Sequence, residues 1–467
     1  MNKNKRNVVF LFADDQRFDT IAALGNKQIQ TPNIDTLVQN GVSFTHALIP
    51  GGTCGAVCMP SRAMVNTGKS LFNLKDHGLS IPSEDKLLGE LFQEQGYETC
   101  GIGKWHNGPR SYARSFTTGG EIFFGGMWDH WNVPANNFDP TGKYENVVPY
   151  ASDFYHSRTL DTMVADHIQM GKHSTELFGE KAIDFIKTRK QDKPFYLYTA
   201  FMAPHDPRTM PKKFHDMYNP EDIPLPANYK EMPEFDFGIH DVRDEILEAY
   251  PRKAEKIQKH IAEYYDMISH LDYEIGLIIQ ALKDTHQFEN TLFVFAGDNG
   301  LALGQHGLMG KQNAYEHSIR VPLIFAGKGV KKNVRTDHPC YLMDIFATLC
   351  DVMGAQKPEN ISSESVYPIL EGKTVEKRDA LYFAYADLLR AVEVGDYKLI
   401  AYANKKGKRF QLFNEKEDPF ELHNQVDNPK YREIRKSLEA ELLKQKEVWN
   451  ERDSVPVCKT FWDNYNK

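Results

Sequence analysis

The feature that most constrains the fold is a series of short apolar runs, rich in β-branched and aromatic residues, that recur along the chain. Each run ends in polar or glycine residues, and helix-like stretches separate the runs. This alternation is typical of an α/β sheet. Three runs matter most, and they are Asn7–Ala13, Pro194–Met202 and Thr291–Ala296. Because ligands of open α/β sheets bind beyond the carboxyl ends of the strands, we expect these runs to deliver polar groups to one edge.

The residues after these runs carry potential ligand groups. Asp14 and Asp15 follow the first run, His205 follows the second, and Asp298 and Asn299 follow the third. Either acidic pair alone more often forms a turn or a helix cap. Together the pairs supply hard oxygen ligands, which suit Ca²⁺ or Mg²⁺ rather than zinc.

Other segments indicate how the chain is organised. Apolar residues at helical spacing predict a long helix over residues 254–282. Residues 107–174 are rich in Gly, Asn, Pro and aromatic residues with little periodicity, which predicts long loops that often bind ligands. After about Lys373 the pattern changes to alternating segments and then a charged helix, so we expect a catalytic domain over 1–373 and a C-terminal subdomain over 374–467. The alternating segments are Leu381–Tyr385, Tyr397–Tyr402 and Phe410–Phe413.

Charge and cysteine content narrow the classes of partner. The net charge is −8 with no long block of one sign, which argues against nucleic acid and anionic membrane surfaces as partners. A polyanionic substrate would need a local basic pocket. Six scattered cysteines do not form a disulfide framework or a zinc pattern, so we expect free thiols, with a Cys340–Cys350 disulfide as the alternative.

The sequence is compatible with more than one cellular compartment. The start of the chain is basic, but the apolar run Val8–Ala13 is too short for the core of a signal peptide and indicates a strand. No window approaches the roughly 20 apolar residues that span a bilayer. The protein is cytoplasmic, or periplasmic or secreted if an export signal was removed ahead of this sequence.

A specific motif begins at Cys58. Residues 58–62 read Cys-Met-Pro-Ser-Arg, and Thr67-Gly68 follows. This segment resembles the Cys-x-Pro-Ser-Arg signature of the type I, formylglycine-dependent sulfatase family. Alone it would also fit a loop that enters a helix, since proline is favoured at helix starts and buried cysteines are usually inert. Residues 103–106, Gly-Lys-Trp-His, are similar to a second motif of that family.

The resemblance covers most of the chain in family order, and residues 107–174 resemble the family least. It implies an α/β fold of the alkaline-phosphatase-like type, a sandwich in which helices flank a large central mixed sheet. A smaller C-terminal α+β subdomain with an antiparallel sheet is also implied. Further segments that carry the resemblance are Thr31–Asp35, Val321–Ile324, Asp344-Ile345, Asp396–Ile400 and Glu417–Pro419.

The resemblance implies a covalent mechanism at Cys58. A maturation partner, either a formylglycine-generating or an anaerobic enzyme, would oxidise Cys58 to formylglycine, whose hydrate offers two hydroxyls. One hydroxyl attacks sulfur, and the second lets the sulfated intermediate collapse, so one difficult step becomes two easier ones. Arg62 would brace the diol. Lys104 would grip sulfate and His106 would contact the formylglycine.

The remaining implied roles concern the cation and the leaving group. Asp14, Asp15, Asp298 and Asn299, together with residue 58, match the family's metal ligands; the resemblance implies Ca²⁺, with Mg²⁺ as the alternative. The cation acts as a Lewis acid that neutralises sulfate charge. His205 would protonate the leaving alkoxide, and Lys311 would stabilise its developing charge.

The substrate class is inferred from aromatic and basic residues near the motifs. Sugars bind through aromatic faces and dense polar groups, often on long loops, so we expect a sulfated oligosaccharide and a carbohydrate sulfatase of the bacterial kind. These side chains equally fit a role in packing the loops together. The candidate substrate-binding residues are Arg17, Trp128, His130, His173, Arg208 and His306.

Three alternatives remain. The chain is also compatible with a broad arylsulfatase, or with a phosphodiester or phosphonate-ester hydrolase on the same scaffold. A third alternative, a sulfated-glycan binding protein that has lost catalysis, is disfavoured because the catalytic set is complete. That set comprises Cys58, Arg62, Lys104, His106, His205 and Lys311.

Overall fold

The three strands that the sequence singles out lie side by side in the computed structural model, which describes residues 5–151, 153 and 159–467. They are β1 (Asn7–Ala13), β10 (Phe195–Ala200) and β11 (Thr291–Gly297), close to the predicted bounds. β1 lies between the other two and runs parallel to both. Their carboxyl ends therefore meet at one edge of the sheet, as predicted.

The central sheet is large and mixed, which confirms the predicted fold class. Its nine strands follow the order β13-β2-β12-β11-β1-β10-β4-β5, with β14 paired to β2. β12 is antiparallel to both β11 and β2, whereas the other pairs are parallel. The strands not yet given are β2 (Gly41–Leu48), β4 (Glu98–Lys104), β5 (Thr118–Phe123), β12 (Arg320–Gly327), β13 (Val334–Thr336) and β14 (Cys340–Tyr341).

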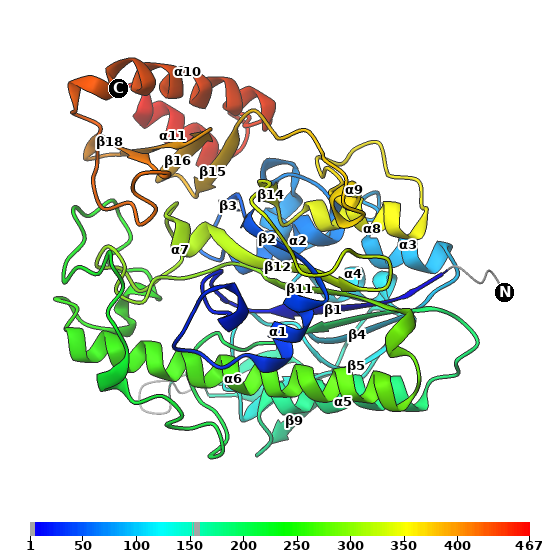
Figure 1. Ribbon diagram of the computed structural model, residues 1–467. Coiled ribbons are helices and arrows are strands. Elements are labelled where there is room, and N and C mark those ends of the chain that lie inside the picture. Colours follow the sequence, from blue (N-terminus) through cyan, green and yellow to red (C-terminus); the bar gives the residue numbers. More distant parts are fainter. Residues whose placement is uncertain (1–4, 152, 154–158) are drawn as a thin grey trace.

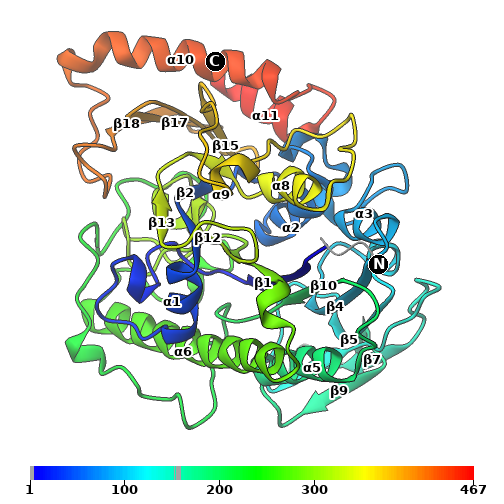
Figure 2. The ribbon, with the colours of Figure 1, turned by 45° about the vertical axis from the view of Figure 1, so that its right-hand side comes forward.

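Helices cover both faces of this sheet (Figures 1 and 2). Because successive strand residues point to opposite faces, Val9 and Leu11 of β1 join the core under α1, α5 and α6, whereas Phe10 and Phe12 join the core under α2, α3 and α8. The predicted helix over 254–282 forms as α6 (Ala254–Asp284). The other helices of these two layers are α1 (Pro32–Gln39), α2 (Cys58–Thr67), α3 (Leu88–Glu94), α5 (Ser174–Thr188) and α8 (Asp344–Met353).

A second sheet lies in the C-terminal part of the chain. Its order is β18-β17-β16-β15-β3, antiparallel except for the pair β15 and β3. Three of its strands match the predicted segments, whereas β16 was missed and β3 comes from before Cys58. The elements are β3 (Gly51–Gly52), β15 (Leu381–Tyr385), β16 (Leu389–Val394), β17 (Tyr397–Asn404), β18 (Gly407–Asn414), α10 (Arg432–Val448) and α11 (Pro456–Tyr465). The domain boundary at 373/374 stays a prediction.

The prediction of long loops over 107–174 is partly wrong, because short helices and strands form there. Residues 152 and 154–158 of this range lie outside the described residues. β6 and β7 each contain a proline, and β5 of the central sheet, which also lies in this range, contains two glycines; these residues masked the alternation. The elements are α4 (Pro109–Ser115), β6 (Asn132–Ala135), β7 (Val147–Tyr150), β8 (Asp161–Val164) and β9 (His167–Met170). Two short helices elsewhere are α7 (Glu316–Ile319) and α9 (Tyr367–Leu370).

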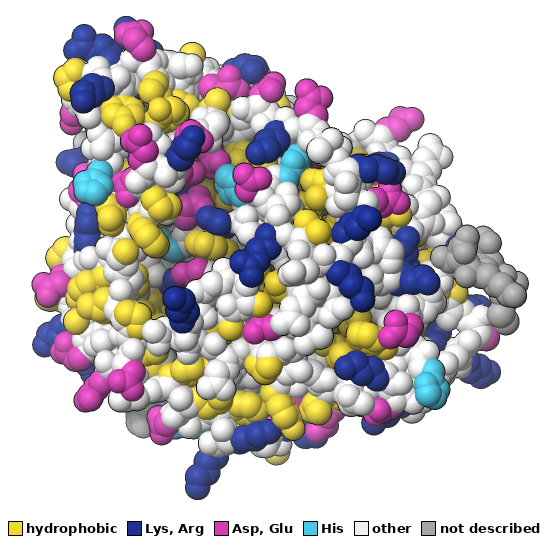
Figure 3. Space-filling model, viewed as in Figure 1, with side chains coloured by type: hydrophobic (Ala, Val, Ile, Leu, Met, Phe, Trp, Pro, Cys, Tyr) yellow, Lys and Arg dark blue, Asp and Glu magenta, His cyan; other side chains and the backbone are white. Residues whose placement is uncertain are grey.

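Two expectations concern cysteines and membranes. All six cysteines are free thiols, so the alternative Cys340–Cys350 disulfide does not form. Among the described residues, each helix is too short or too polar to cross a bilayer. On the face in Figure 3, acidic and basic side chains are interspersed.

Candidate active site

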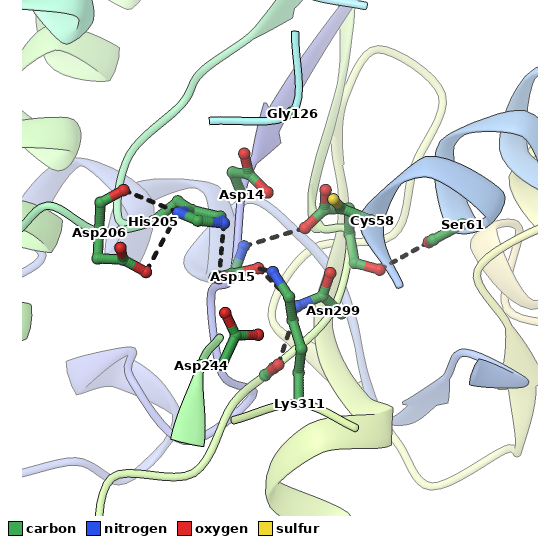
Figure 4. A network of polar contacts seen from close by, with 12 residues as sticks. Asp14, Asp15, Cys58, Ser61, Gly126, His205, Asp206, Asp244, Asn299 and Lys311 are labelled. Carbon is green, nitrogen blue, oxygen red and sulfur yellow. Dashed lines mark hydrogen bonds and ion pairs between the residues drawn. The ribbon is translucent and has the colours of Figure 1, made fainter. Parts of the chain in front are cut away.

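The carboxyl ends of the parallel strands and the start of α2 meet at one place (Figure 4). Asp14 and Asp15 leave β1 directly, Asp298 and Asn299 leave β11, and Cys58 is the first residue of α2. Lys104 ends β4 and His205 follows β10. The structure thus brings together side chains that lie far apart in the sequence. His106 and Lys311 join the same group.

Cys58 is buried among basic groups. Cys58 is 3% exposed, and its Sγ lies 3.5 Å from His106 Nδ1 and 3.8 Å from Lys104 Nζ. Burial raises the pKa of this thiol to about 11, although Lys104 and Lys311 oppose the shift. At neutral pH an unmodified Cys58 is therefore a thiol and a poor nucleophile.

Arg62 contacts the carboxylates of Asp298 and Asp14 rather than Cys58. Its Nε donates to Asp298 Oδ2 at 2.8 Å, and its Nη2 lies 3.8 Å from Asp14 Oδ1. The guanidinium stacks 4.9 Å from the centroid of the Phe12 ring, and the Ser61 hydroxyl donates to the Asp298 carbonyl at 2.6 Å. The first turn of α2 thus fixes the end of β11.

Each remaining carboxylate has a lysine partner. Lys104 forms an ion pair with Asp14. Lys311 Nζ lies 2.6 Å from Asp15 Oδ1 (Figure 4). Asn299 Nδ2 donates to the same Asp15 oxygen at 2.7 Å. The site therefore alternates acidic and basic groups in a buried space, where their interactions are stronger than in water.

The residues also fit a divalent cation. Asp14 Oδ1 and Asn299 Oδ1 are buried without a hydrogen-bond partner in the described part of the chain. Asp14, Cys58 and Asp298 each bring one ligand atom within 4.8 Å of the others. Burial, followed by the charge of Asp14, raises the pKa of Asp298. Burial also acts to raise the pKa of Asp14, but the positive charges around it, chiefly Lys104 and Arg62, lower this pKa overall. A hard cation would satisfy the two free oxygens and the opposed carboxylates.

His205 has a defined orientation. Its Nδ1 donates to the Asp206 carbonyl at 2.8 Å, and its Nε2 lies 3.5 Å from Asp15 Oδ2. The ring of His130 donates from Nε2 to the His205 carbonyl at 2.9 Å, which holds the loop. Because Nδ1 is engaged with a carbonyl, Nε2 is the atom that can exchange a proton with substrate.

Sequence reasoning missed the support around His205. Arg243 Nη1 lies 2.7 Å from Asp206 Oδ1, and Gln312 donates to Asp244 at 2.6 Å beside Lys311. Arg243 and Asp244 come from a segment without periodicity or motif, so they gave no signal. The local sequence marked this turn only by the prolines on either side of His205 and Asp206, which are Pro204 and Pro207.

Two of the candidate substrate-binding histidines are interior residues. His130 and His173 have no exposed surface, and their rings stack 4.9 Å apart. His173 caps α5 by accepting from the Thr175 amide at 3.2 Å. This placement does not support direct substrate contact by either ring and instead favours a role in packing. Trp128 donates to the Asn132 carbonyl at 2.9 Å and packs on the core, half-buried.

The other candidates lie around the cluster without joining it. Arg17 pairs with Asp19 and lines a cavity of about 560 Å³. Arg208 Nη1 lies 2.7 Å from a ring nitrogen of His260, and His306 stacks on Tyr315 at 4.0 Å. Within the described residues, none of these three side chains hydrogen-bonds to the groups around Cys58, and their roles stay predictions.

Family models match nearly the whole chain. A model described as sulfatase matches residues 6–355, and one described as the C-terminal region of N-sulphoglucosamine sulphohydrolase matches residues 304–448. An arylsulfatase of Clostridium perfringens is 29% identical, over 97% of each chain. An N-acetylglucosamine-6-O-sulfatase of Bacteroides thetaiotaomicron is 25% identical over 96% of this chain and 87% of its own length.

Solved structures share the fold. A protein solved in complex with its substrate D-glucosamine-2-N,6-O-disulfate superposes with a TM-score of 0.78 at 22% identity, over 97% of this chain and 99% of its own. The fold is the alkaline-phosphatase-like fold.

Proposed function

This chain belongs to the sulfatase family and hydrolyses sulfate esters, and from that premise we propose that it removes sulfate from a sulfated oligosaccharide by means of the cluster around Cys58. The observation that carries the proposal is the convergence of Cys58, three carboxylates and three basic side chains at one sheet edge. A sulfate group is an anion around a tetrahedral centre, and such a site offers it opposite charges from several directions.

Two groups outside the twenty amino acids complete the proposed site. A Ca²⁺ or Mg²⁺ ion held by Asp14, Asp15, Asp298 and Asn299 would supply Lewis-acid polarisation of the sulfate oxygens when bound. Formylglycine made from Cys58 would supply a hydrated aldehyde as nucleophile in place of the thiol. The high pKa of the Cys58 thiol supports the need for this conversion.

The chain's own residues bind sulfate and move a proton. Lys104 and His106 both border Cys58; Lys104 would bind the sulfate oxygens and His106 would contact the formylglycine. Arg62 holds Asp298 and Asp14 in position. His205 would give its Nε2 proton to the departing sugar oxygen, because its Nδ1 is already committed to the Asp206 carbonyl. Lys311 would stabilise the charge that develops on that oxygen.

The carbohydrate assignment is supported by the related proteins. One relative is named for an N-acetylglucosamine sulfate, and a protein of the same fold was solved with a glucosamine disulfate as its substrate. The arylsulfatase relative keeps a second candidate open, namely broad action on aryl sulfates.

One experiment separates these candidates. The matured enzyme is assayed for kcat/KM on sulfated mono- and oligosaccharides, on nitrophenyl sulfate and on the matching phosphate and phosphonate esters. We expect a sulfated sugar to be the best substrate. If nitrophenyl sulfate is turned over far more efficiently than every sugar tried, the enzyme is an arylsulfatase; a faster phosphonate ester would overturn sulfate specificity itself.

A further inference from the structure

A second cluster of ligand groups lies on the opposite side of the sheet from α2, between α5 and α6. His270 and Glu274 are four residues apart on α6 and therefore share one helix face. Glu176 is in the first turn of α5, which packs against α6. One ligand atom from each of these three side chains lies within 4.8 Å of the other two.

Two of the three side chains are buried without partners. His270 has no exposed surface, and neither of its ring nitrogens has a hydrogen-bond partner among the described residues. Glu274 is 4% exposed, and its Oε2 likewise has no partner there. An unsatisfied buried polar group costs about 1–3 kcal/mol, so three such atoms in one place call for an explanation.

α5 leaves space for the Glu274 carboxylate. A Cβ atom at Gly179 would lie 2.6 Å from Glu274 Oε2, closer than such atoms can approach. Glycine inside a helix is about 1 kcal/mol less favourable than alanine. This helix therefore contains an unfavourable residue at the point where the carboxylate needs room.

The nearby lysines Lys213 and Lys172 compensate the charge of Glu274 only in part. Burial, and then Glu176 and Glu180, raise the pKa of Glu274 to about 7, and burial, followed by His130 and Lys213, lowers the pKa of His270 to about 3. The Lys213 ammonium lies 3.6 Å from the centroid of the Tyr273 ring and forms no ion pair with Glu274. A bound cation would favour the ionised carboxylate and the neutral imidazole, which is the form that ligates metals.

We propose that His270, Glu274 and Glu176 bind a zinc ion, at a site distinct from the catalytic cation site. One imidazole nitrogen and two carboxylate oxygens form a mixed ligand set that suits Zn²⁺, whereas the oxygens near Cys58 suit Ca²⁺ or Mg²⁺. Glu176 is half-exposed, which gives the ion a path from solvent and leaves a fourth position to water.

The site connects to the catalytic loop through packed rings. His270 lies 4.9 Å from His173, His173 stacks on His130 at 4.9 Å, and His130 holds the His205 carbonyl. Zinc would fix the ring of His270 and join α5 to α6. We assign it a structural role, because none of its ligands reaches the reacting atoms.

The test counts zinc ions on the full-length protein. Chelator-stripped protein is first saturated with Ca²⁺ to occupy the oxygen-rich site and is then titrated with Zn²⁺ by calorimetry. We expect wild-type protein to bind one more Zn²⁺ than Glu274→Gln or Glu176→Gln, and we expect zinc to raise Tm in the wild type alone. Substituting Co²⁺ should give the visible absorption of a tetrahedral nitrogen-containing site, lost in both variants.

A matched control uses a histidine–glutamate pair that has no third ligand group beside it among the described residues. His167 Nε2 lies 3.1 Å from Glu121 Oε2 and both side chains are half-buried, so Glu121→Gln removes a comparable carboxylate and should leave zinc stoichiometry unchanged. Glu176→Gln keeps the test decisive if Glu274→Gln fails to fold, because Glu176 is half-exposed. Equal zinc uptake by wild type and Glu176→Gln would overturn the proposal, and the sulfatase assignment would be unaffected.

Discussion

At the scale of single residues, the proposed mechanism depends first on the identity of residue 58. We expect Cys58→Ala and Cys58→Ser each to lower kcat/KM by at least about 10³-fold, because neither side chain forms the diol. Tm should stay near the wild-type value, since Cys58 forms no disulfide and both replacements are small. The assay is steady-state hydrolysis of the best sulfate ester, with thermal unfolding in parallel. Wild-type turnover by Cys58→Ala would refute the formylglycine mechanism.

His205 should matter in proportion to the basicity of the leaving group. General acid catalysis contributes about 10²–10⁴-fold when the departing oxygen is strongly basic. We therefore expect His205→Ala to lose far more kcat on a sulfated sugar than on nitrophenyl sulfate, which serves as the internal control. Equal losses on both esters would reassign His205 to sulfate binding or to architecture.

The sequence identified residues better than it identified their contacts. Asp14, Asp298, Cys58 and Lys104 come from four separate motifs, and the parallel strand order brings them together as expected. The contact of Arg62 with Asp298 was not predictable, because it depends on how α2 sits over the end of β11. The burial of His130 was not predictable for a similar reason, because an isolated histidine in a sequence gives no sign of whether its ring is buried.

At the scale of elements, the position of Lys104 depends on the backbone of Gly103 in β4. Gly103 has a φ of +84°, and it lies beside a register shift in which Glu121 is the extra residue of β5. A Cβ at Gly103 would lie 2.1 Å from the Ala200 carbonyl oxygen of β10. The left-handed backbone of this glycine therefore lets β4 pack closely on β10 and sets the direction of the next residue, Lys104.

We expect Gly103→Ala to destabilise the protein by at least about 2 kcal/mol, from the left-handed backbone and the clash together. Turnover should fall further than stability alone explains, because Lys104 would be displaced from Cys58. Urea unfolding and kcat measured well below Tm check the two effects. As a matched control, Gly96→Ala has a similar φ of +78° but no atom within 4 Å of its added Cβ, so it should be milder and spare kcat.

The elements that were predicted are those with strong patterns. β1, β11 and α6 are long and apolar or periodic, and their bounds were nearly right. β16 has the sequence Leu-Arg-Ala-Val-Glu-Val, with a buried arginine and a buried glutamate, so its alternation was weak. Arg390 is buried because Glu451, 61 residues away, bonds its guanidinium, and such long-range pairing cannot be inferred from local sequence.

At the scale of the whole molecule, buried histidines make stability depend on pH. The rings of His306 and His317 pack against Tyr315. Burial, with a further contribution from Lys230, lowers the pKa of His306 to about 3. Burial, followed by the charge of His306, keeps the pKa of His317 well below its usual value. The unfolded chain binds protons near pH 6.5 whereas the folded chain does not, so stability is complete above that pH and falls as pH decreases.

Between pH 7 and pH 5 each such histidine should cost about 2 kcal/mol. From pH 7 to pH 5 the free energy of unfolding of His317→Phe should therefore fall by about 2 kcal/mol less than that of the wild type. Urea unfolding at both pH values measures this difference. Other titrating groups are common to both proteins and cancel in the comparison. A parallel pH dependence in His317→Phe would contradict the assignment.

The position of β3 has a consequence for how the protein is made. Within the described residues its one strand partner is β15, through the hydrogen bonds from the Ala384 amide to the Pro50 carbonyl and from the Ala386 amide to the Gly52 carbonyl. β3 leads directly into the loop before Cys58. At ~5–20 residues per second, a ribosome needs roughly 15–65 s to travel from β3 to β15. Throughout that interval the segment around Cys58 lacks its final partner. An enzyme that modifies Cys58 would thus have most of the time of translation in which to reach a side chain that the finished fold encloses.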